Sequence, residues 1–138
     1  MIYDLGAVIP VPEARLKAMM QLLDATLSQD PMAMDDALMK MGGRQGQGAP
    51  LALYRESAEC ITPLFAPGEQ DSSDVRVHRR LRELTPKVWA AMDRLQPPAD
   101  TLLLSRALNG HDWNLVRLKA RLDMHYRTQP LLGWARTA

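Results

Sequence analysis

The sequence predicts a mainly α-helical, compact domain of about six helices with a short strand at its N-terminus. Apolar residues recur along most of the chain at spacings of three and four, which is the period of an amphipathic helix. Prolines, glycines and aspartates, which mark helix starts and ends, separate these stretches. The chain has 138 residues, of which 46% are hydrophobic and 24% charged, so a single globular domain over residues 1–138 is expected.

The first two helices are the best marked. The first is expected at about residues 12–28, and its apolar stripe consists of Leu16, Met19, Met20, Leu23 and Leu27. Asp30 before Pro31 is typical of a second start, because the aspartate can cap the helix and proline suits its first position. Gly42 is expected to end this second helix, since glycine adopts the left-handed backbone of a helix end without strain.

Proline and glycine also divide the rest of the chain. After a loop at residues 42–50, a third helix is expected at 51–65 and a fourth at about 74–95. Pro86 should kink or split the fourth helix near Leu84, because proline lacks a backbone donor and clashes with the preceding turn. A fifth helix should end at Leu108 and a sixth should span about 112–123, with Gly110 between them. The tail that contains Pro130 is expected to be mostly irregular, and residues 2–5 are expected to form a short strand with no obvious partner.

Cysteine content and hydropathy indicate the compartment. Cys60 is the only cysteine, so we expect a buried free thiol in a reducing environment. No stretch approaches the roughly 20 apolar residues of a membrane span, and the first residues lack the pattern of a signal peptide. The sequence therefore predicts a cytoplasmic protein.

Charge is distributed unevenly along the chain. Residues 1–74 hold 5 Lys/Arg against 11 Asp/Glu, whereas residues 75–138 hold 12 against 5. The simplest interpretation is that the two halves pack together, because complementary helices need no external partner. The alternative is an anionic partner, such as nucleotide phosphates, a lipid surface or an acidic protein. Nucleic acid is not expected, since the basic residues are not interleaved in sequence with aromatics that could stack on bases.

Several patterns that resemble functional sites have structural explanations. The methionines of residues 19–41 are expected to fill the core. The loop at residues 42–48 is rich in glycine, but it lacks the preceding strand and the Gly-Lys-Ser/Thr ending of a phosphate-binding loop. His78, His111 and His125 lie far apart without a second ligand at metal spacing. The chain is therefore expected to carry no catalytic residue and no cofactor-binding residue.

Tyr3-Asp4-Leu5-Gly6 is the one candidate metal motif. An apolar strand that ends in Asp-x-Gly is the arrangement in which kinases hold the magnesium that bridges ATP phosphates. Asp4 would be the metal ligand, Leu5 would pack inward, and Gly6 would allow the sharp exit of the chain.

Two segments resemble the UbiB/AarF family of atypical kinase-like proteins. The run IYDLGAVIPVPEARLKAMMQLLDATLSQDPMAMDDALMKMGG is similar to the family segment that begins at the metal-binding motif, with Leu5 where the family usually has phenylalanine. The run LLLSRALNGHDWNLVRLKARLD resembles the family's C-terminal leucine-rich helical hairpin. The resemblance implies the C-terminal part of a kinase-like C lobe, from a family that uses Mg and ATP and is linked to ubiquinone or isoprenoid-lipid metabolism.

The same resemblance implies that the chain is catalytically incomplete. The family's N-terminal lobe, its Lys-x-Gly-Gln motif and its catalytic loop have no counterpart in these residues, so only Asp4 takes over a family role. One carboxylate cannot hold Mg-ATP, and no cofactor is expected for this chain alone. The expected partners are the missing N-terminal kinase-like region or another protein, an anionic lipid surface, or a second copy paired through the N-terminal strand. A free-standing helical protein-interaction module and a helical lipid-binding domain remain alternative functions.

The leucines of the second segment predict a specific packing. Leu103, Leu104, Leu108, Leu115 and Leu118 recur at helical spacings and need an apolar surface. We expect the hairpin of residues 100–123 to pack on the helices of residues 12–41.

Overall fold

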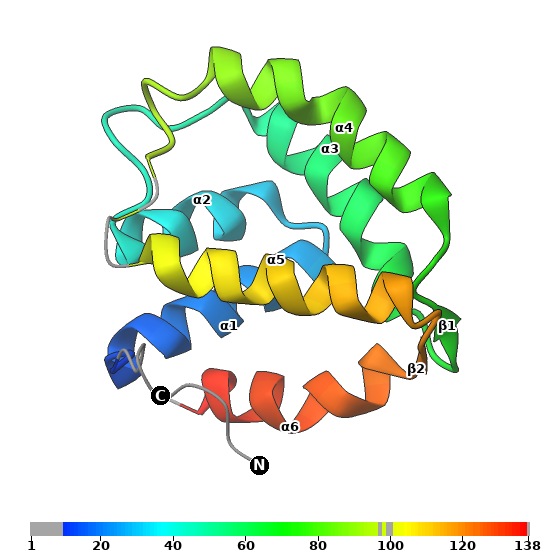
Figure 1. Ribbon diagram of the computed structural model, residues 1–138. Helices are drawn as coiled ribbons and strands as arrows, with labels where there is room; N and C mark the ends of the chain where they lie inside the picture. The colour runs from blue at the N-terminus through cyan, green and yellow to red at the C-terminus, as the bar shows by residue number, and fades with distance from the viewer. Residues whose placement is uncertain (1–9, 97, 99–100, 138) are drawn as a thin grey trace.

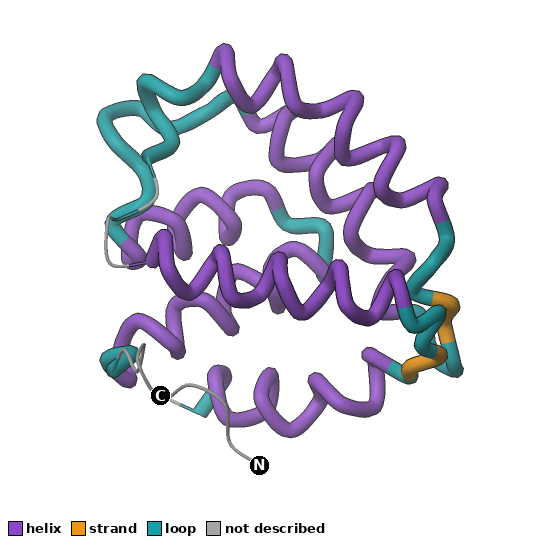
Figure 2. Tube along the Cα trace, in the orientation of Figure 1, coloured by secondary structure: helices purple, strands orange, loops and turns teal. Residues whose placement is uncertain are grey.

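The computed structural model describes residues 10–96, 98 and 101–137, and it confirms a mainly helical, compact fold (Figures 1 and 2). The α-helices are α1 (Glu13–Leu27), α2 (Pro31–Met41), α3 (Leu51–Ile61), α4 (Val75–Ala90), α5 (Leu102–Arg117) and α6 (Met124–Arg136). A 3-10 helix, η1 (Thr62–Phe65), follows α3, and the strands β1 (Gln70–Asp71) and β2 (Arg121–Leu122) form a short antiparallel pair. The predicted strand at residues 2–5 and the candidate metal ligand Asp4 lie outside the described residues.

The first two helices form as their sequence predicts. Asp30 accepts hydrogen bonds from the backbone N–H groups of Met32 and Ala33, and Gly42 closes α2 with a φ of 76°. The pair α1–α2 is the most extensively packed in the fold, and α3 packs on both helices. The hydrophobic core lies between α1, α2, α3 and the end of α4, and its residues are Ala25, Met34, Ala49, Leu53, Tyr54, Ala58 and Ala91. Because several of these residues are alanines, the helix backbones can approach closely.

The glycine-rich loop at residues 42–50 is anchored around one carboxylate. The Tyr54 hydroxyl donates to Asp35 Oδ1 over 2.8 Å and accepts from the backbone N–H of Ala49 over 3.2 Å. Arg44 Nε lies 3.0 Å from the same Asp35 oxygen and forms an ion pair with it, although this buried nitrogen makes no hydrogen bond. Burial, and then the hydrogen bond to Asp35, raise the pKa of Tyr54 above its ordinary value. The loop is therefore part of the framework and not a loose connection.

The last helix was not predicted. The sequence around Pro130 suggested an irregular tail, but α6 runs through it. Asp123 caps the first turn by accepting from the N–H of Tyr126 over 2.8 Å, and α6 then packs on α1. Leu132 is the largest side chain that is fully buried in the described residues. Burial on α1 thus offsets the cost of a proline inside the helix, which is about 3 kcal/mol.

The predicted split of the fourth helix and the predicted end of the fifth helix were also wrong, whereas a kink at Pro86 stays a prediction. Pro86 lies inside α4 without dividing it, and Gly110 lies inside α5, which continues to Arg117. The third helix ends at Ile61 and continues only as η1. Single prolines and glycines in the sequence therefore predicted more helix ends than the structure has. Each lowers the stability of a helix, but the helix still forms when tertiary contacts support it.

The predicted packing of residues 100–123 on the first two helices was wrong as well. α5 runs across the middle of the view in Figure 1. It packs closely against no other helix of the described structure. Leu103, Leu108 and Leu118 are 58%, 53% and 77% exposed. The apolar surface of α1 and α2 is instead used by α3 and α6, which leaves much of α5 exposed.

The charge asymmetry of the sequence is partly satisfied inside the fold. Four ion pairs join the acidic and the basic half: Arg136–Asp24, Lys87–Glu56, Arg121–Glu69 and, at the boundary of the two halves, Arg76–Asp74. Cys60 is buried and free, as predicted, and burial raises the pKa of its thiol.

Candidate functional site

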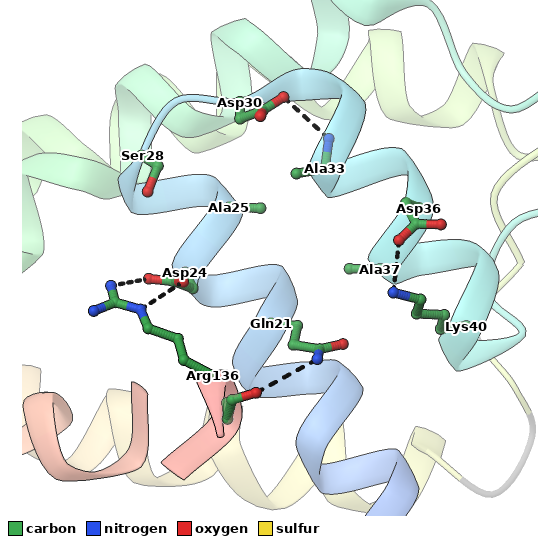
Figure 3. Close-up of a pocket in the computed structure, with 11 residues that line it drawn as sticks. Gln21, Asp24, Ala25, Ser28, Asp30, Ala33, Asp36, Ala37, Lys40 and Arg136 are labelled. Carbon is green, nitrogen blue, oxygen red and sulfur yellow. Dashed lines mark hydrogen bonds and ion pairs between the residues drawn. The ribbon is translucent and has the colours of Figure 1, made fainter. Parts of the chain in front are cut away.

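A surface groove lies between α1, α2 and the end of α6, and has a volume of about 440 Å³. Ala25, Ala33 and Ala37 line its centre, and charged side chains from the three helices surround them (Figure 3). Arg136 reaches from α6 to the carboxylate of Asp24, and the Gln21 amide donates to the carbonyl of Ala135.

The charged groups of this groove neutralise one another. Arg136 Nε donates to Asp24 over 3.0 Å, and Lys40 pairs with Asp36 over 2.7 Å. The hydrogen bonds from Arg136 hold the pKa of Asp24 below its ordinary value, against the opposing effect of partial burial. Asp30 is occupied in capping α2. The groove therefore has the character of a seam between helices, not of a site with chemical groups free to act on a ligand.

The histidines and the described acidic residues form no joint metal site, and Asp4, the predicted metal ligand, lies outside the described residues. Among the described residues, no group of three His, Cys, Asp or Glu side chains could hold a metal ion. His78 stacks on Trp113, with 6.2 Å between ring centres and 9° between ring planes, and His125 lies 3.4 Å from the amide of Gln129. Glu56 pairs with Lys87, so it has a structural partner.

A second surface, on α4 and α5, carries exposed tryptophans next to arginines. Trp89 is 69% exposed and Trp113 is 63% exposed. Arg82 precedes Trp89 by seven residues, and Arg106 precedes Trp113 by the same interval. Seven residues are close to two helical turns, so each arginine lies on the same side of its helix as the tryptophan. We call Arg82, Trp89, Arg106 and Trp113 the Arg-Trp face.

The His78–Trp113 stack joins the two halves of this face. His78 precedes Trp89 by eleven residues, or about three turns, so the two side chains share one side of α4. The stack therefore brings Trp113 of α5 next to the first turns of α4, and Trp89 lies about three turns further along α4. Leu81, Val88 and Met92 are each 37% exposed and add further apolar surface to the same segment of the chain.

The arginines of the Arg-Trp face have no anionic partner in the described structure. Arg82 and Arg106 are exposed, and neither forms an ion pair with a described residue. Arg79 on α4 and Arg117 on α5 are also exposed and also form no ion pair with a described residue. The internal pairing of the acidic and basic halves thus leaves several cations of α4 and α5 unneutralised.

Sequence reasoning missed these residues because it considered aromatic and basic positions as neighbours along the chain. The available signal was the interval Arg-x₆-Trp, which occurs once on α4 and once on α5, and a third time at Arg127 and Trp134 on α6. On the folded helices this interval interleaves arginine with tryptophan, so the reason given for excluding nucleic acid does not hold in the structure.

Within the described residues, the structure contains no helix that is long and apolar enough to span a membrane. Comparisons with models of protein families, with curated proteins and with solved structures find no match to this chain.

Proposed function

We propose that this chain is the non-catalytic, helical C-terminal-lobe portion of a UbiB/AarF-like protein and that its Arg-Trp face binds an anionic lipid surface. The observation that carries the binding role is the exposure of two tryptophans, each with an unpaired arginine two helical turns before it. The two helices that carry them are in contact through the His78–Trp113 stack. The assignment to the family rests on the sequence resemblance of the two segments. The first of them contains helices α1 and α2 up to Gly42, and the second contains all of α5 and β2.

The chemistry of the face suits the boundary between lipid headgroups and acyl chains. Tryptophan favours this boundary because its ring is largely apolar while its N–H can still contact water. Arginine can remain at headgroup level while the aliphatic part of its side chain covers apolar surface. Basic residues near an anionic leaflet each contribute about 1 kcal/mol to binding. Together these features are those of helices that lie in a membrane interface and do not cross it.

Lipid is favoured over nucleic acid by the aliphatic side chains of the surface. Bases would stack on tryptophan and their phosphates would attract arginine. However, Leu81, Val88 and Leu103 would gain little from a hydrated nucleic-acid backbone, whereas burial in lipid removes them from water.

Vesicle co-sedimentation tests the proposal. The chain should bind vesicles that contain phosphatidylserine and should bind pure phosphatidylcholine vesicles much more weakly. The double variant Arg82→Gln/Arg106→Gln should weaken binding by roughly tenfold or more. The matched control Arg55→Gln/Arg127→Gln also removes two exposed cations without ion pairs, but from α3 and α6, and should bind nearly as the parent chain does.

Two outcomes would contradict the lipid proposal. Equal losses in the two double variants would mean that net charge, and not the Arg-Trp face, drives binding. Tight binding to a single-stranded oligonucleotide, together with no preference for anionic vesicles, would assign the face to nucleic acid instead.

The non-catalytic part of the proposal has its own test. The resemblance gives a metal role to Asp4 alone, and the complete family protein would use Mg and ATP. We expect no ATP hydrolysis and no measurable Mg-ATP affinity by isothermal titration. Binding tighter than about 100 μM, roughly −5.5 kcal/mol, that disappears in Asp4→Ala would contradict this expectation.

A further inference from the structure

An apolar cavity of about 210 Å³ lies beside the helices of the Arg-Trp face. Residues from η1, α4, α5 and the first turn of α6 form its walls: Leu64, Phe65, Val77, Leu81, Leu115 and Met124. None of these residues belongs to the main core cluster, and each is only partly buried or exposed. The cavity is therefore a second apolar region, which the protein's own side chains do not fill.

Hydrogen bonds and a ring stack hold the cavity walls in place. The Ser72 hydroxyl donates to the carbonyl of Leu115 over 2.8 Å, and the Ser72 N–H donates to the carbonyl of Ala120 over 3.0 Å. The β1–β2 pair joins the same two segments of the chain by strand pairing. The stack of His78 on Trp113 connects α4 to α5. These contacts fix the wall without filling the space, which preorganises it for a ligand.

The polar groups around the cavity favour a head group without negative charge. Asp71 and Asp112 contribute carboxylates to the lining, together with His78, Gln70 and Ser72. Hydrogen bonds from Ser73 lower the pKa of Asp71, so this carboxylate is ionised at neutral pH. Arg121 is the cation that also acts on Asp71, but it is in an ion pair with Glu69 over 3.4 Å. A carboxylate or phosphate ligand would therefore meet repulsion, whereas a hydroxyl could donate to these oxygens.

We propose that this cavity binds one unbranched apolar chain of about eight carbons that ends in a hydroxyl group. The chain length follows from volume, because an apolar cavity of about 150 Å³ holds a benzene molecule, and 210 Å³ has room for roughly eight carbons in proportion. The hydroxyl preference follows from the two carboxylates at the polar side. This site does not depend on lipid-surface binding by the Arg-Trp face.

Titration with straight-chain 1-alcohols tests both features, with amide chemical shifts and tryptophan fluorescence as readouts. Affinity should rise about fourfold for each added methylene up to octanol and then level off, because further carbons no longer fit. Octanoate at neutral pH should bind at least about tenfold more weakly than octanol, because its carboxylate meets Asp71 and Asp112. An affinity that continues to rise through dodecanol, or that is equal for octanoate, would overturn the proposal in favour of general adsorption on apolar surface.

A pair of variants on one helix localises the site. Leu115→Phe adds volume inside the cavity and should reduce octanol affinity by at least about tenfold, whereas Leu108→Phe changes an exposed leucine of α5 outside the cavity and should leave it unchanged. Should Leu115→Phe fail to fold, Leu81→Phe fills the cavity from α4 and gives the same comparison. Equal affinity in the filled variant and the control would place octanol elsewhere and overturn the proposal.

Discussion

The guanidinium of Arg136 donates to both carboxylate oxygens of Asp24, and this pair fixes the last turn of α6 to the last turn of α1. Two further contacts act at the same place. Lys17, also on α1, lies 5.8 Å from the ring centre of Trp134 and donates to the carbonyl of Thr137 over 3.3 Å. Thr137 itself caps α6 by donating its N–H and its hydroxyl to the Trp134 carbonyl, and Lys17 of α1 supplies a donor to the next free carbonyl, that of Thr137.

The Asp24–Arg136 pair predicts a specific acid sensitivity. Because the pKa of Asp24 is lowered in the folded chain, its contribution to stability is fully present above the unfolded pKa of about 4. That contribution should be lost as the pH falls below about 4 and through the lower folded value. Urea unfolding at pH 7 and at pH 3 should show that Arg136→Gln loses less stability on acidification than the parent chain. An identical acid dependence in both would mean that the pair is not formed in solution.

Leu132→Ala should show that α6 belongs to the cooperative fold. Leu132 is fully buried, so its truncation should lower the free energy of unfolding by about 2–5 kcal/mol. The adjacent Leu131→Ala removes the same atoms from a half-exposed position and should cost less than about 1 kcal/mol. Chemical denaturation of both variants measures the difference. Equal small losses would show that α6 is detached from the body in solution.

The helices that the sequence predicted well are those with complete boundary signals. Asp30-Pro31 at one end and Gly42 at the other marked α2 to the residue, because cap chemistry is local. The sequence failed at α6, since Pro130 looks the same whether or not α1 is present to bury Leu132. It failed in the opposite direction for α5, whose leucines resemble a core stripe but are largely exposed.

The candidate sites were less predictable for the same physical reason. Arg82 and Trp89 share a helix face, which the sequence contains as a seven-residue interval, but their exposure depends on which side of α4 meets α3. The cavity near Leu115 depends on segments as distant in sequence as Leu64 and Met124. The spacing of residues along one helix does not show which distant segments of the chain will be in contact with it. Asp4, the only metal candidate from sequence, stays a prediction.

The glycine loop offers a prediction with an internal control. Gly48 has a φ of 74°, and a Cβ at this position would meet Asp35 Oδ1 at 2.3 Å and Arg44 Nε at 2.7 Å. Gly46 has a similar φ of 58°, but a Cβ there meets nothing within 4 Å. Gly46→Ala should therefore cost only the left-handed strain of about 1–2 kcal/mol, and Gly48→Ala should cost clearly more because the Asp35–Arg44 pair must move. Similar unfolding midpoints for the two would argue against the observed loop position.

Tyr54→Phe tests the hydrogen bonds by which the Tyr54 hydroxyl connects Asp35 of α2 to Ala49 of that loop. The substitution leaves the N–H of Ala49 without its acceptor and removes one donor from Asp35, so it should cost about 1–3 kcal/mol. Tyr126→Phe removes the same hydroxyl from an exposed position on α6 and should change stability by less than about 0.5 kcal/mol. Thermal or urea unfolding distinguishes the two, and a loss in Tyr126→Phe as large as that in Tyr54→Phe would contradict the buried network.

The weak packing of α5 predicts early hydrogen exchange and a response to lipid. From residue 105 to residue 114 every side chain is exposed, so little tertiary contact opposes local opening of this helix. Its amides should exchange well before those of α1 and α2, which pack extensively on each other. If the Arg-Trp face binds anionic vesicles, their addition should slow exchange in α5 and α4 and leave α2 unchanged, while phosphatidylcholine vesicles should have little effect. Protection of α5 equal to that of α1 in the free chain would mean that another element covers this helix in solution.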